Sequence, residues 1–113
     1  MLVVDRAFVS RIESKDHGMK SLDQILYENL SQLEEARIIE DKRLVDLVNN
    51  LSEESINKEI TYTGFEAGET TSTINMILIK IFNHQTHHRG QVHNMLSQAG
   101  IKPPQIDIPD LII

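Results

Sequence analysis

Apolar residues near the start of the chain recur at the spacing of an α-helix. Within residues 1–14, Val4, Phe8 and Ile12 lie four positions apart. This recurrence places apolar side chains on one helical face. The pattern therefore predicts a helix over 1–14. Its start is abrupt, because no capping residue or leading polar turn precedes the apolar face.

A second amphipathic segment follows a short loop at residues 15–20. Ser21, with Gln24 three positions later, has the spacing of a helix capping box. Apolar residues then recur to about Asn50, and charged residues occupy the opposite face. We therefore expect one long helix over 21–50.

The pattern then changes from helical to extended. Residues 56–63 alternate and are rich in β-branched side chains, and a segment of Thr and Ser follows Gly64 and Gly68. This predicts two short strands around a glycine-containing turn. An isolated hairpin is marginally stable in water, so we expect it to pack on the helices.

The last predicted helix runs from about Thr73 to Ala99. Gly100 is a natural C-terminal stop, and the Pro-Pro pair at 103–104 prevents continuation. The tail at 105–113 is too short to have a core of its own. We expect it to fold back on the helices or to meet a partner.

Length and composition restrict the class of protein. A chain of 113 residues is one domain, 1–113, with a modest core. Because it has no cysteine, a transition metal would need imidazole or carboxylate ligands. The net charge of −6 argues against nucleic-acid binding. We see no signal peptide and no membrane-spanning run, so we expect a cytoplasmic protein that binds neither nucleic acid nor membrane.

The chemistry concentrates in the last predicted helix, at the string Asn83-His84-Gln85-Thr86-His87-His88-Arg89-Gly90-Gln91. Successive helical residues advance by about 100°, so His88 lies about 40° from His84, and Gln91 about 20° to the other side. Four apolar residues fall in or beside the same sector: Ile77, Ile81, Val92 and Met95. The pattern therefore predicts that His84 and His88 project from a buried face.

Two imidazoles one turn apart on a buried face favour a shared metal ion. Each neutral ring has a donor and an acceptor to satisfy, and protonating both would bury like charges. An ion binds one nitrogen of each ring and leaves the other N–H for a nearby acceptor. The alternative is a pair of core histidines hydrogen-bonded to backbone or carboxylate. No Glu follows His84, so the zincin mechanism does not apply.

The other histidines have different predicted places. His87 lies about 60° from His84, at the rim of the pair, and His93 lies roughly opposite, on the expected surface. His17 falls in a predicted loop and is expected to be exposed. Gly90 in mid-helix costs about 1 kcal/mol. Gly90 therefore indicates either that another helix approaches closely at this position or that the helix simply tolerates a glycine there.

The block His84-x-x-x-His88-Arg89-Gly90-Gln91, with the helix stop behind it, resembles the C-terminal signature of the DinB/YfiT-like family. Asp5-Arg6 with Phe8 and Arg11 also resembles the end of that family's second helix. The resemblance covers nearly the whole chain and is strongest over 83–104. It implies a four-helix up-down bundle that binds nickel, zinc or iron through three histidines, two of them His84 and His88.

The chain departs from the family pattern at the third histidine. In the family this ligand lies a few residues before an Asp-Arg pair like Asp5-Arg6, which would place it upstream of Met1. We therefore expect a mainly α-helical bundle that lacks the first helix and part of the second. About three helices would remain, with a short hairpin before the last.

Three explanations for the departure are open. The protein begins earlier than Met1, or it is naturally short and has lost a complete site, or two copies associate and cover the bare apolar flank. The last two are compatible, and a symmetric dimer is the commonest such solution. We therefore expect a homodimer.

The resemblance implies a metal-dependent enzyme of thiol-dependent transferase or hydrolase type, acting on a small molecule. His84 and His88 would be ligands. Gln91, His87 and Arg89 would support a ligand or orient the substrate. No catalytic nucleophile or base stands out. The alternative is a non-catalytic, dimerising helical module with a residual, incomplete metal site.

Overall fold

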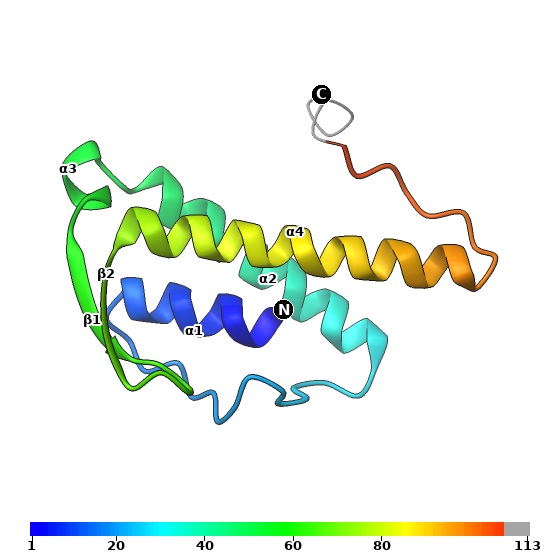
Figure 1. Cartoon of the computed structure of the whole chain (residues 1–113), viewed down its shortest axis with the longest axis horizontal. Coiled ribbons are helices and arrows are strands. Elements are labelled where there is room, and N and C mark those ends of the chain that lie inside the picture. The colour runs from blue at the N-terminus through cyan, green and yellow to red at the C-terminus, as the bar shows by residue number, and fades with distance from the viewer. Residues whose placement is uncertain (108–113) are drawn as a thin grey trace. The chain divides into compact units, whose positions relative to one another are not determined.

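The computed structural model describes residues 1–107 and is mainly helical (Figure 1). Residues 108–113 lie outside the described part. The prediction that the tail folds back on the helices or meets a partner falls largely on these residues. The elements in order are α1 (Leu2–Ile12), α2 (Leu30–Asn49), α3 (Glu53–Ile56), β1 (Glu59–Thr63), β2 (Glu69–Thr73) and α4 (Ile74–Gln98). The predicted fold class, helices with a short hairpin before the last one, is confirmed.

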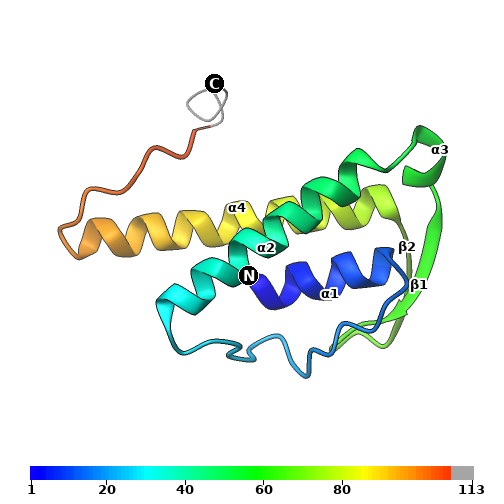
Figure 2. The same cartoon turned by 180° about the vertical axis from the view of Figure 1, so that it is seen from behind.

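The chain divides into two compact units, Met1–Ile81 and Phe82–Ile113. In the first unit, Figures 1 and 2 show from opposite sides that α1 lies beside α2, with the hairpin near the C-terminal end of α1. Its core is aliphatic apart from one phenylalanine, as the low aromatic content requires. The buried cluster comprises Val4, Phe8, Val9, Leu44, Ile74, Ile77, Leu78 and Ile81. The interpretation of 1–113 as a single domain stays a prediction.

The predicted start of the second helix is wrong. α2 begins at Leu30, and its N-cap Asn29 accepts hydrogen bonds through Oδ1 from the amides of Ser31 and Gln32 at 2.8 and 3.3 Å. Gln24 does not complete a capping box. Its Oε1 accepts instead from the amide of Lys20 at 2.8 Å.

Residues 21–29 form turns and irregular structure rather than a helix. Tyr27 Oη accepts a hydrogen bond from Arg6 at 3.1 Å, which ties this segment to α1. Leu22, Ile25 and Leu26 line a hollow together with the first residues of α1. Tertiary contacts therefore override a sequence pattern that is compatible with a helix.

The hairpin is confirmed, with β1 and β2 antiparallel and Glu59 paired with Thr73. Arg11 of α1 contacts the hairpin and holds it against this helix. Its guanidinium lies 4.7 Å from the ring centre of Phe8 and 4.6 Å from that of Tyr62, and it donates to the carbonyl of Thr63 at 2.9 Å. Burial lowers the pKa of Arg11, but an arginine stays protonated at physiological pH.

The one-turn helix α3 was not predicted. Its N-cap Ser52 accepts through Oγ from the amide of Ser55 at 3.1 Å, while Ser55 Oγ accepts from the amide of Ser52 at 2.7 Å. This reciprocal pair is a capping box built from two serines.

Within residues 1–107, no helix has both the length and the apolar character needed to cross a bilayer.

Charged side chains connect α1 to α2. The carboxylate of Glu40, 3% exposed, lies 3.5 Å from Arg6 Nε and 3.2 Å from Arg43 Nη1. Arg43 Nε also donates to Glu13 Oε1 at 3.1 Å. This hydrogen bond lowers the pKa of Glu13, with Lys15 acting in the same direction against the opposing effect of burial.

The lowered pKa of Glu13 predicts a pH-dependent contribution to stability. A carboxylate with a depressed folded pKa contributes stability that is present above its unfolded pKa of about 4.3 and is lost as pH falls through the folded value. We expect wild type to be more stable than Glu13→Gln at neutral pH, and this difference to shrink in acid. Urea unfolding of both proteins from about pH 7 to pH 3 measures it. A difference that stays constant across this range would contradict the linkage.

Candidate metal centre

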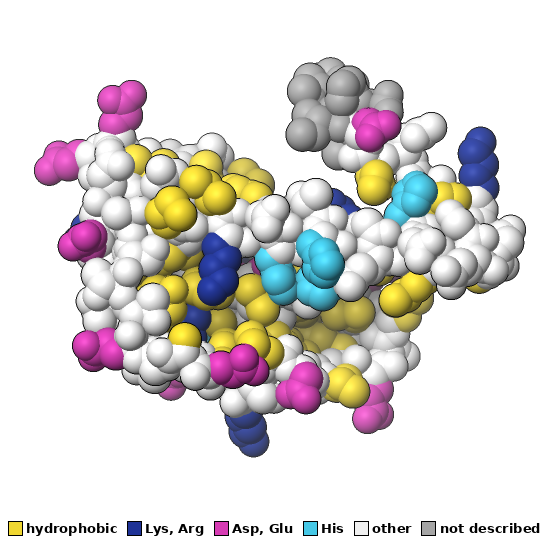
Figure 3. Space-filling view, in the orientation of Figure 1, with side chains coloured by type: hydrophobic (Ala, Val, Ile, Leu, Met, Phe, Trp, Pro, Cys, Tyr) yellow, Lys and Arg dark blue, Asp and Glu magenta, His cyan; other side chains and the backbone are white. Residues whose placement is uncertain are grey.

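The side chains of His84 and His88 meet near the middle of α4. Their Nε2 atoms lie 3.0 Å apart, and the two rings meet edge to face with centres 4.4 Å apart. Both side chains are half-buried. Histidine side chains gather on the visible surface of this helix (Figure 3). Helical spacing predicted that these two residues share a face, and in the structure their Nε2 atoms face each other.

Gln91 sets the tautomer of His88. Its Oε1 lies 2.7 Å from His88 Nδ1, and an amide oxygen can only accept, so Nδ1 carries the proton. A neutral His88 then has its lone pair on Nε2, the atom facing His84. This is the arrangement found in metal-binding histidines, whose other N–H is donated to a nearby acceptor.

The separation of the two nitrogens fits a shared ion. Two nitrogens bound to one ion at 2.0–2.1 Å lie roughly 2.8 to 3.4 Å apart, from a right angle to a tetrahedral angle. The observed Nε2–Nε2 distance of 3.0 Å falls inside this range. It equally allows one hydrogen bond from His84 Nε2 to His88 Nε2. The alternative of a hydrogen-bonded histidine pair therefore stays open.

In the described part of the chain, His84 and His88 are the two side chains at this place that could serve as metal ligands. Among residues 1–107, no three histidine, aspartate or glutamate side chains come together as a set that could hold a metal ion. The third ligand that the resemblance implied is therefore not found within this range. Two nitrogens bind an ion weakly unless other donors complete its coordination shell.

His87 and Arg89 flank the pair. His87 is exposed, with its ring centre 5.3 Å from that of His88, which agrees with its predicted place at the rim. Arg89 is exposed and donates to Thr86 Oγ1 at 3.2 Å. Thr86 Oγ1 in turn donates to the carbonyl of Phe82 at 2.9 Å.

The remaining histidines do not join the centre. His93 is half-buried rather than exposed. His17 is also half-buried, because its Nδ1 accepts from the amide of Met19 at 2.9 Å and its ring lies 5.4 Å from that of Phe65. At Gly90, a Cβ atom would meet nothing within 4 Å in the described structure, which favours simple tolerance.

The expectation that the whole apolar stripe of α4 is buried is wrong. Ile77 and Ile81 are buried, at 1% and 0% exposure, but Val92 and Met95 are 54% and 63% exposed. Periodicity shows which side chains share a face. It does not show how far along a long helix that face is covered.

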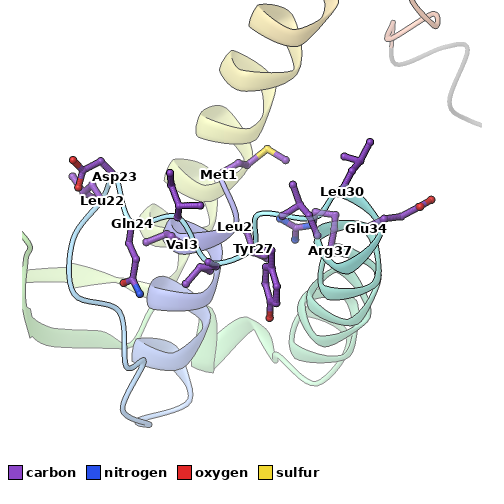
Figure 4. A pocket seen from close by; sticks show the side chains of 13 residues that line it. Met1, Leu2, Val3, Leu22, Asp23, Gln24, Tyr27, Leu30, Glu34 and Arg37 are labelled. Carbon is purple, nitrogen blue, oxygen red and sulfur yellow. The ribbon is translucent and has the colours of Figure 1, made fainter.

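A hollow that the sequence did not predict lies in the unit Met1–Ile81. Figure 4 shows side chains from the start of α1, residues 22–27 and the start of α2 around a volume of about 460 Å³. Its walls are mostly apolar, and two of its polar side chains have partners on neighbouring elements. Arg37 binds Asp5 and Asp41, and Tyr27 accepts from Arg6.

Comparison with known proteins supports the family resemblance that the sequence motifs indicated. The family model described as "DinB family" matches residues 1–112. The chain therefore belongs to the DinB family. It is similar to Protein DinB of Bacillus subtilis (strain 168), with 34% identity in a match that covers 66% of this chain and 48% of that protein. The match spans about half the length of this relative. No solved structure matches the chain significantly.

Proposed function

We propose that this DinB-family chain binds a divalent metal ion through Nε2 of His84 and Nε2 of His88. The observation that carries the proposal is their 3.0 Å separation, with the Nδ1 proton of His88 directed away to Gln91. Nitrogen ligands without thiolate suit zinc, nickel or iron. Because the chain has no cysteine, imidazole and carboxylate are the side-chain groups that could bind such an ion.

The proposal extends to chemistry at the same place. A divalent ion held here would supply a Lewis acid that activates water or a thiol, the chemistry that a thiol-dependent transferase or hydrolase needs. His87 is exposed beside the pair and would support a ligand or orient the substrate. Gln91 would keep His88 in the tautomer that binds the ion, and Arg89 could attract an anionic small molecule.

A second candidate is a non-catalytic module whose metal site is incomplete within one chain. The observation in its favour is that residues 1–107 bring together only His84 and His88, and no third histidine, aspartate or glutamate joins them. Both candidates require metal at the same two nitrogens, so one experiment tests their common basis.

The common basis is tested by adding Zn²⁺ to chain that has been stripped with a chelator and following the imidazole nitrogens by NMR. We expect the Nε2 signals of His84 and His88 to shift together, because each donates a lone pair to the ion. His17 and His93 are internal controls, since neither lies at the centre. Shifts at those two histidines with none at His84 and His88 would reject the proposed function.

A further inference from the structure

Four arginines in the described part of the chain are half-buried, and one of them differs from the others. Arg6, Arg37 and Arg43 each form an ion pair with a buried carboxylate of α1 or α2. Arg11 forms no ion pair within residues 1–107 and donates to a backbone carbonyl at 2.9 Å. None of its nitrogens is both buried and without a hydrogen-bond partner, so its remaining N–H groups reach solvent. Arg11 therefore has donors available to a ligand.

Lys80 brings a second cation to the aromatic ring that Arg11 contacts. Arg11 Cζ lies 4.7 Å and Lys80 Nζ 4.6 Å from the ring centre of Phe8. The two charges therefore lie within a Debye length of about 10 Å of each other. Lys80 is exposed, and within residues 1–107 it forms no ion pair. Its own helix offers it no carboxylate, because α4 contains neither Asp nor Glu.

The acidic groups of the neighbouring elements do not compensate this pair of charges. In α1, Asp5 binds Arg37, and Glu13, just after this helix, binds Arg43. The glutamates of the segment 59–69 are exposed, and within residues 1–107 they form no ion pair. Yet the chain has 17 Asp and Glu against 11 Lys and Arg. Two like charges repel each other, and an anion that contacts both removes this repulsion.

We propose that Arg11 and Lys80 form a binding site for the oxyanion of a small molecule, a carboxylate or a phosphate. The planar guanidinium donates parallel hydrogen bonds that match two oxygens of such a group. The rings of Phe8 and Tyr62, whose centres lie 4.7 and 4.6 Å from Arg11 Cζ, hold the guanidinium in place. Lys80 adds a second charge on a flexible stem. The site uses no metal ion, so it is independent of the proposed function.

The test follows both cationic groups by NMR in chain freed of metal on a chelating resin. Sodium phosphate and sodium acetate are titrated separately, with NaCl keeping the ionic strength constant. We expect the Nε–Hε signal of Arg11 and the Nζ signal of Lys80 to shift together and to saturate. Saturation with phosphate alone would identify a phosphate-bearing ligand, and saturation with acetate alone a carboxylate. Shifts that do not saturate with either anion, or that NaCl alone reproduces, would overturn the site.

Substitution of an exposed lysine tests the site without disturbing the core. We expect Lys80→Gln to raise the Kd of the anion roughly two- to fivefold, the effect of losing one exposed ion pair. Lys42→Gln is the matched control, because it removes the same charge from an exposed lysine that lies 2.6 Å from Asp46, and it should leave the Kd unchanged. Arg11→Lys keeps the charge but removes the planar fork, and should weaken binding at least as much as Lys80→Gln. Equal weakening by Lys80→Gln and Lys42→Gln would show that net charge attracts the anion and that there is no site.

Discussion

Replacing His84 and His88 together by alanine is expected to leave the purified chain without bound divalent metal. The two Nε2 atoms lie 3.0 Å apart and are the proposed ligands that the described part of the chain brings together. Removing both leaves no nitrogen donor at the centre. Elemental analysis after loading with metal and removing the excess should find a fixed ratio of metal to chain in wild type and only background in the double variant.

Two further variants give the result its specificity. His93→Ala removes a histidine on the opposite side of the same helix and should retain the metal of wild type. Gln91→Leu keeps both ligands but removes the acceptor 2.7 Å from His88 Nδ1. Loss of such a supporting hydrogen bond should weaken binding about 10- to 100-fold. A double variant that retains metal at the wild-type ratio would show that the ion binds elsewhere.

Ile77→Ala is expected to destabilise the fold by about 3 kcal/mol, within the range of 2–5 kcal/mol for such truncations. Ile77 is 1% exposed and belongs to the buried cluster that joins α4 to α1 and α2. The substitution removes buried methyl and methylene groups and leaves a cavity. Because small domains are stable by only about 5–15 kcal/mol, this loss is a large part of the total.

The matched control lies two residues further along the same helix. Ile79 is 53% exposed, so Ile79→Ala should change the unfolding free energy by no more than about 0.5 kcal/mol. Ile77→Val should lie between the two, at about 0.5–1.5 kcal/mol. Urea unfolding of the three variants measures the series. Equal losses at Ile77 and Ile79 would contradict the assignment of the buried face.

Several elements could be predicted from local sequence patterns. Apolar spacing predicted α1 within one to two residues at each end, and the glycines between 63 and 69 predicted the turn of the hairpin. Gly100 marked the end of α4 to within two residues. These predictions succeed because the responsible forces act between residues that are close in the chain.

The beginning of α2 could not be predicted in this way. Leu22 and Ile25 have a spacing compatible with a helix, but they belong to an irregular segment, and capping starts at Asn29. The hydrogen bond from Arg6 to Tyr27 spans 21 positions of sequence. A local pattern contains no information about a contact of this separation.

The sequence by itself determined that the chain is mainly helical and that His84, His88 and Gln91 share one side of its last helix, because a helix repeats every 3.6 residues whatever surrounds it. Only the tertiary structure decided that the two Nε2 atoms face each other and that Gln91 holds the outer nitrogen of His88. It also decided that the stripe buried at Ile77 is open at Met95. Rotamers and burial depend on neighbours brought together by folding, and periodicity along one helix does not specify them.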